Sequence, residues 1–77
     1  MEIIGSTWSS IRVRVGGRTT TLTGEGMPDG GPVHFCADLA SIRSWENGIQ
    51  ITDAERDRIA RELPGIASRT GFVVVVA

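Results

Sequence analysis

Two adjacent glycines at positions 16 and 17 separate two runs that are typical of β-strands. Residues 11–15 alternate apolar and charged side chains, and a period of two indicates a strand with one buried face. Residues 18–23 are rich in β-branched threonine, which favours strands. Because two glycines readily adopt the positive φ angles of a tight two-residue turn, the sequence predicts an antiparallel hairpin. The pairs expected in it are Val15 with Arg18, Val13 with Thr20, and Ile11 with Leu22.

Glycine and proline dominate residues 24–32, and we expect a loop there. Residues 33–39 then alternate again, which predicts another half-buried strand. In that strand the apolar residues face one side, and His34, Cys36 and Asp38 face the other.

The chain from Ser41 to Trp45 fits two structures. It could extend the sheet. It could instead form a short helix, with Asp38 as its N-cap and Gly48 as its end.

A helix is expected from residue 52 onward. Thr52 and Glu55 have the spacing of a capping box, in which each side chain binds the backbone amide of the other residue. Because Pro64 lacks an amide hydrogen, we expect a kink or break near Leu63 and two helical segments that share one buried face. The apolar stripe of this face consists of Ile59, Ala60, Leu63, Ile66 and Ala67.

The last apolar segment, residues 72–76, shows no polar alternation, which predicts a strand that is central or covered on both faces. The expected fold class is therefore α+β. It consists of a mainly antiparallel sheet of four to five strands, with a C-terminal, Pro-kinked helix packed on one face and followed by a final apolar strand. A chain of 77 residues is expected to form a single domain, residues 1–77.

Composition narrows the cellular setting. A net charge of −1 provides no general attraction to nucleic acid or to anionic membranes. A single cysteine excludes an internal disulfide framework and favours a reducing compartment. The longest apolar run, residues 72–77, is far shorter than the roughly 20 residues of a membrane span. The N-terminus also lacks the pattern of a signal peptide, so we expect a cytoplasmic protein without membrane contact.

The inventory of catalytic residues is small, because the chain has one histidine, one cysteine, no lysine and no tyrosine. His34, Cys36 and Asp38 form the only cluster that suggests a metal or a nucleophile. A structural zinc site needs four ligands, so two carboxylates would have to complete it. We therefore predict no catalytic residues, no metal site, no cofactor and no enzymatic activity.

A binding surface remains, and Trp45 is its first candidate residue. It stands just before a predicted turn and helix cap. It either fills the core of a small domain or anchors a partner, since tryptophan is enriched at interface hot spots. In the second interpretation, Arg43, Glu46 and Asn47 would form a polar rim around it.

A second candidate surface contains Trp8, Arg12 and Arg14, which share one side of the first strand if that strand runs unbroken. A basic and aromatic sheet face can stack nucleic-acid bases, so a small nucleic-acid-binding module is one alternative function. A homo-oligomeric structural module, such as a homodimer joined through residues 72–77, is another.

Two motifs close together resemble a known family. The segment Ser41-Ile42-Arg43-Ser44-Trp45-Glu46 is followed by Ile51-Thr52-Asp53-Ala54-Glu55-Arg56. This arrangement is similar to the small bacterial "immunity protein 74" family, whose pattern also includes a Gly-Glu step and an aromatic strand. Gly24-Glu25 and Phe35 match those parts. The resemblance implies an immunity protein of a polymorphic toxin system, which binds a cognate toxin domain and neutralises it without performing chemistry.

Overall fold

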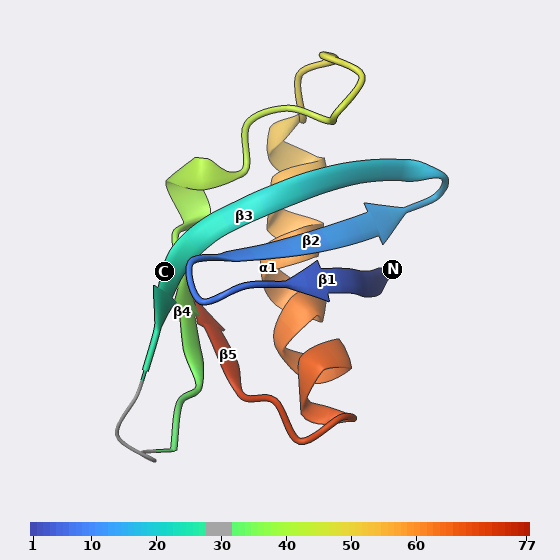
Figure 1. The fold of residues 1–77 in the computed structure, drawn as a ribbon. Coiled ribbons are helices and arrows are strands. Elements are labelled where there is room, and N and C mark those ends of the chain that lie inside the picture. The colour runs from blue at the N-terminus through green and yellow to red at the C-terminus, as the bar shows by residue number, and fades with distance from the viewer. Residues whose placement is uncertain (28–31) are drawn as a thin grey trace.

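The computed structural model describes residues 1–27 and 32–77. Its five strands form one sheet in the order β1-β2-β3-β4-β5. Neighbouring strands are antiparallel from β1 to β4, and β4 and β5 are parallel (Figure 1). The α+β prediction is thus confirmed. The elements are β1 (Glu2–Ser6), β2 (Ser10–Val15), β3 (Arg18–Gly26), β4 (Phe35–Ala37), the 3₁₀ turn η1 (Leu39–Ser41), α1 (Asp53–Ser68) and β5 (Val74–Val76).

The hairpin between β2 and β3 forms as predicted. Gly16 and Gly17 have φ angles of 56° and 82°, which side chains other than glycine rarely tolerate. The turn sets the predicted register, in which Val15 pairs with Arg18 and Ile11 with Leu22. This register directs Ile11, Val13 and Val15 to the buried side of the sheet.

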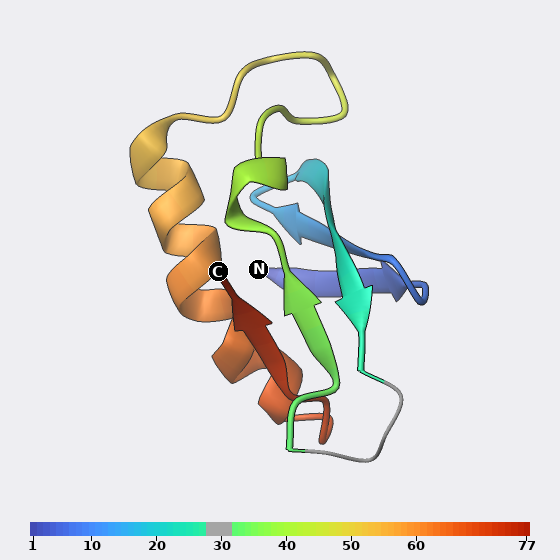
Figure 2. The same ribbon diagram turned by 90° about the vertical axis from the view of Figure 1, so that its left-hand side faces the viewer.

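The core lies between the sheet and α1, which runs along one side of it (Figure 2). Ile59, Leu63 and Ala67 form the buried stripe of α1, while Ala60 and Ile66 are half-buried beside it. In the described part of the chain, no other α-helix covers the sheet, so its opposite side is open. The sheet contributes Ile11, Val13, Val15, Leu22, Phe35, Ala37 and Val74 to the core.

Pro64 does not divide the helix into two segments, because α1 is continuous from Asp53 to Ser68. A proline inside a helix removes one backbone hydrogen bond, and this cost can be offset by packing on both sides of it. Leu63 and Ala67 are buried on either side of Pro64 and supply that packing.

The expected position of the last strand was wrong. Val74–Val76 form β5 at the edge of the sheet, where β4 is the only neighbouring strand among the described residues. Val74 is buried, but Val75 is 41% exposed on the open side. An unbroken run of valines fits an edge strand as well as a central one, because β-branched side chains suit extended backbone whether or not both faces are covered.

The expected loop also begins later than predicted. Gly24 and Gly26 belong to β3 and pair with Ala37 and Phe35 of β4. Residues 28–31, the centre of the expected loop, lie outside the described residues.

The ambiguous segment after β4 combines both interpretations. Asp38 caps a short 3₁₀ turn by accepting a hydrogen bond from the Ala40 amide at 3.0 Å. Beyond it, Ser44 forms an isolated antiparallel bridge with Gln50. Gly48, with a φ of 88°, lies in the turn between them rather than at the end of a helix.

The capping box of α1 is present and leads to a stability prediction. Thr52 Oγ1 accepts a hydrogen bond from the Glu55 amide at 3.1 Å, and Glu55 Oε1 accepts one from the Thr52 amide at 2.9 Å. Thr52→Ala is expected to lower the free energy of unfolding by about 1 kcal/mol. In a domain of this size the melting temperature falls by several degrees. Thermal unfolding measures the effect, and Thr52→Ser, which keeps the hydroxyl, is the matched control. An unchanged melting temperature would contradict the prediction.

Candidate protein-binding surface

The open side of the sheet carries the alternate residues of β2 and β3. Arg12 and Arg14 project from β2 opposite Thr21 and Thr19 of β3, and both arginines are exposed. The other alternate residues of β2 and β3 are buried and face α1. No other α-helix is present in the described residues, so no helix covers the side that carries the arginines. The hairpin therefore presents a polar surface to solvent.

Each arginine on this surface is paired with a carboxylate. Arg12 donates from Nε and Nη2 to the two oxygens of Glu46, at 2.7 and 2.8 Å. Arg14 pairs with Glu2 of β1. The hydrogen bonds from Arg12 hold the pKa of the Glu46 carboxyl below its usual value, and Glu46 in turn raises the pKa of Arg12. These pairs neutralise the charge of a surface that the sequence had suggested to be basic.

The pair between Arg12 and Glu46 also connects the loop after η1 to the sheet. The Glu46 amide donates to the Thr19 carbonyl at 2.7 Å, which extends the pairing of β3. Thr20 Oγ1 donates to the Ser44 carbonyl at 2.9 Å. Two consecutive residues of β3 thus bind the loop, Thr19 through its backbone carbonyl and Thr20 through its side chain.

Trp45 lies in the core. It is only 2% exposed, and together with Val15 and Ile59 it lines a small cavity. The guanidinium carbon of Arg18 lies 4.3 Å from the centre of the indole ring, a cation–π geometry. Its Nε1 has no hydrogen-bond partner among the described residues. Trp45 therefore offers almost no surface to a partner directly.

Arg18 is held over Trp45 by the capping residue of α1. Its Nη2 lies 2.5 Å from Glu55 Oε2, while the other oxygen of Glu55 accepts from the Thr52 amide. The Thr52 amide and then Arg18 lower the pKa of the Glu55 carboxyl. The Glu55 carboxylate thus binds both the start of α1 and Arg18 of the hairpin, and Arg18 in turn lies over the indole of Trp45.

Hydrogen bonds within the loop fix the residues around Trp45. Asn47 Oδ1 accepts from the Ile49 amide at 3.0 Å, and the Trp45 amide donates to the Ile49 carbonyl at 2.9 Å. Arg43 is exposed and donates to the Ala40 carbonyl at 3.1 Å. A shallow hollow of about 210 Å³ lies at this end of the sheet, lined by Gly17, Arg18, Thr19, Trp45, Glu46 and Asn47.

Trp8 does not continue the strand that carries Arg12 and Arg14, so that part of the sequence-based interpretation was wrong. β2 begins only at Ser10, and Trp8 lies in the turn between β1 and β2. Its carbonyl accepts the Gly26 amide at 3.0 Å, and its side chain is 68% exposed. The turn is thus attached to β3 rather than aligned with β2.

His34 and Asp38 each accept a hydrogen bond from a backbone amide in this structure. His34 Nδ1 accepts the Val73 amide at 2.9 Å, and its ring stacks on Phe72 with centroids 5.8 Å apart. Asp38 caps η1, and Cys36 is a free, half-buried thiol. Within residues 1–27 and 32–77, no group of three or more His, Cys, Asp or Glu is arranged to hold a metal ion.

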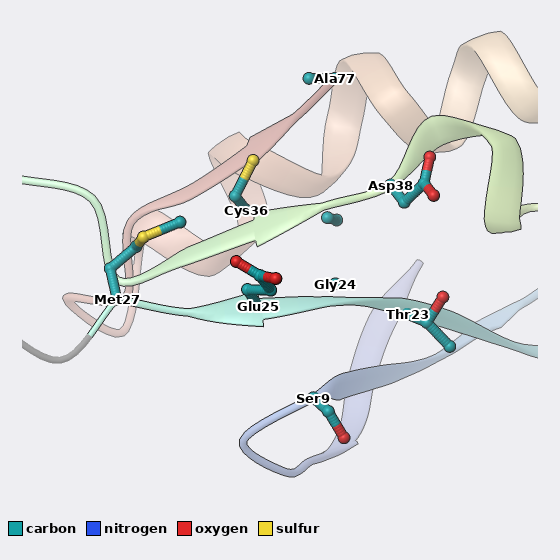
Figure 3. Close-up of a pocket in the computed structure, with 9 residues that line it drawn as sticks. Ser9, Thr23, Gly24, Glu25, Met27, Cys36, Asp38 and Ala77 are labelled. Atoms are coloured by element: carbon teal, nitrogen blue, oxygen red, sulfur yellow. The ribbon is translucent and has the colours of Figure 1, made fainter.

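Sequence reasoning missed the other half of the open face. β3, β4 and β5 direct one set of alternate residues away from α1, and Figure 3 shows several of them around a hollow of about 570 Å³. The register aligns Glu25 with Cys36 and Cys36 with Val75 in one row across the three strands. Alternation in residues 33–39 indicated the central strand, but nothing local placed Val75 beside it.

No helix in the described ranges has the length and apolar composition needed to cross a bilayer. Among family models, the one described as "Immunity protein 74" matches residues 3–77. The chain belongs to the immunity protein 74 family. The resemblance based on the segments around Trp45 and Thr52 is thus confirmed. No curated protein and no solved structure matched the chain.

Membership in the immunity protein 74 family gives the chain an immunity function in general terms. It implies a toxin as the general class of partner. Immunity proteins are not, in general, enzymes.

Proposed function

We propose that this immunity protein binds the toxin domain encoded at its own locus and neutralises it by direct protein–protein contact. The observation that carries the proposal is the open side of the sheet, which α1 leaves uncovered. A sheet face whose backbone is fixed by strand pairing loses little conformational entropy on binding. The family match supports the same class of partner.

The protein is large enough for such an interface. A standard complex buries about 800 Å² on each partner. The accessible surface of the chain is 4664 Å², so the contact would occupy roughly a sixth of it. We also propose that residues 1–77 act as one domain. This domain works in the cytoplasm, where its single cysteine stays reduced.

The contacts that we propose are Arg12 and Arg14 on the open face together with Arg43, Glu46 and Asn47 in the loop after η1, all exposed. Trp45 is buried beneath this loop and packs against Arg18, which holds the loop residues in position. Trp8, as an exposed aromatic side chain in a hydrogen-bonded turn, is a further proposed contact.

The nucleic-acid alternative has less support. It requires Trp8, Arg12 and Arg14 on one exposed basic face. In the structure Trp8 is outside β2, and each arginine is already paired with a carboxylate. A phosphate backbone would have to displace both carboxylates, which favours the protein partner.

Co-expression tests the proposal. When the toxin domain is expressed in a sensitive cell together with this protein, survival is expected, and the two proteins should co-purify as a 1:1 complex. The toxin domain expressed alone is the control for killing. Continued killing while both proteins remain soluble and folded would refute the proposed function.

A further inference from the structure

The outward side of β3, β4 and β5 differs from the rest of the open face. We call it the β3–β5 outer face and define it by Glu25, Met27, Cys36, Asp38, Val73 and Val75. Backbone hydrogen bonds align its rows, from the Met27 amide to the His34 carbonyl at 2.9 Å and from the His34 amide to the Val73 carbonyl at 2.9 Å. The side chains therefore stand on a backbone that is already ordered.

Apolar side chains are unusually exposed on this face. Val75 is 41% exposed, and Met27 and Val73 are each 38% exposed. Five large apolar side chains are exposed in the described part of the chain, and these three are among them. Val75 lies in β5, Val73 directly precedes β5 and Met27 directly follows β3, so a partner that spans these neighbouring segments can cover all three side chains together.

The charges on this face are not balanced by cations. Glu25 and Asp38 both line the hollow of about 570 Å³ (Figure 3), and neither forms a salt bridge with any described residue. One oxygen of Asp38 accepts the Ala40 amide, which leaves the other available. By contrast, Glu2 and Glu46 on the other half of the open face are each paired with an arginine.

We propose that the toxin domain docks on the β3–β5 outer face and places one arginine or lysine side chain in the hollow lined by Glu25 and Asp38. Apolar neighbours of that side chain then cover Met27, Val73 and Val75. A partner of this chemistry matches both features of the face, because an apolar contact area excludes water around the ion pair and strengthens it. The inference rests on the proposed function and extends the proposed contact from the end of the open face that carries Arg12 and Arg14 to its other half.

Affinity measurements with the purified toxin domain from the same locus test the inference. Glu25→Gln keeps the shape of the side chain and removes its charge, and it is expected to weaken binding at least about tenfold. Val75→Thr, which suits a strand, should weaken binding several-fold. Asp57→Asn removes an exposed carboxylate of α1, which also lacks a salt bridge among the described residues, and should leave the affinity unchanged. Melting curves establish that each variant is folded.

A double-mutant cycle identifies the occupant. Each arginine and lysine on the toxin surface is changed to alanine and measured against wild-type protein and against Glu25→Gln. For the residue that occupies the hollow, the loss caused by Glu25→Gln should largely disappear. Full additivity for every toxin residue would overturn the proposed occupant.

The remaining outcomes separate the inference from the function on which it rests. If wild-type protein binds the toxin and folded Glu25→Gln and Val75→Thr bind equally well, the docking surface lies elsewhere, and only the inference fails. If wild-type protein does not bind the toxin at all, the proposed function fails, and the inference fails with it. If sedimentation shows a dimer that Val75→Thr dissociates and that the toxin does not displace, a second copy covers this face and the inference is overturned.

Discussion

Replacing Trp45 by alanine is expected to lower the free energy of unfolding by about 3–5 kcal/mol. The indole is 2% exposed and packs beneath Arg18, so its removal leaves a cavity that the surrounding backbone cannot fill. It also removes the surface on which Arg18 rests between the hairpin and Glu55. Because small domains are only marginally stable, much of the population should be unfolded at 37 °C.

Trp45→Phe is the matched control for this prediction. The phenyl ring keeps much of the packing, and no hydrogen bond is lost, because Trp45 Nε1 has no partner among the described residues. Urea denaturation and toxin affinity should be measured on both variants. We expect Trp45→Ala to lose binding only through loss of folding. A stable Trp45→Ala protein whose affinity is reduced about thirtyfold or more would instead identify Trp45 as an interface anchor.

Gly24→Ala is expected to be the next most damaging change, with a loss of about 3 kcal/mol, at the upper end of the range for overpacking. A Cβ atom on Gly24 would overlap the Cys36 carbonyl oxygen and approach the Cα of Ala37 to 2.9 Å. Both are backbone atoms of β4, so a side-chain rotation cannot relieve the contact. β3 and β4 would have to separate where they pair.

Gly65→Ala provides a control with the opposite sign. A Cβ atom at Gly65 meets nothing within 4 Å, and the residue lies inside α1. Alanine there should stabilise the protein by about 0.5–1 kcal/mol, because it reduces the entropy that the backbone loses on folding. Denaturant midpoints of the two variants should move in opposite directions. Equal midpoints for Gly24→Ala and wild type would contradict the close approach of β3 and β4.

Several elements could be predicted because their signals are local. Gly16 and Gly17 set the hairpin and its register through their own φ angles. The capping box at Thr52 and Glu55 depends on residues three positions apart. Each of these signals lies within one turn of backbone, where the chain geometry leaves few alternatives.

The candidate surface was predictable only in part. Arg12 and Arg14 were correctly assigned to one face of a strand, but their partners Glu46 and Glu2 were not foreseen. Arg12 and Glu46 are 34 residues apart in the sequence, and no local pattern connects them. The sequence around Trp45 was consistent with a core residue and with an interface anchor. Only the position of Trp45 between the hairpin and α1 established that it is buried.

By itself, then, the sequence determined the local elements: the hairpin, the start of α1, its buried stripe and the α+β class. The tertiary structure decided which strands and side chains lie next to each other. It placed β5 parallel to β4 at the edge of the sheet, kept α1 continuous through Pro64, and aligned Glu25, Cys36 and Val75 across three strands. The physical reason is that turns and caps depend on the conformations of a few neighbouring residues. Strand order and surface composition depend instead on which distant segments bury apolar area together, and the periodicity of one segment does not contain that information.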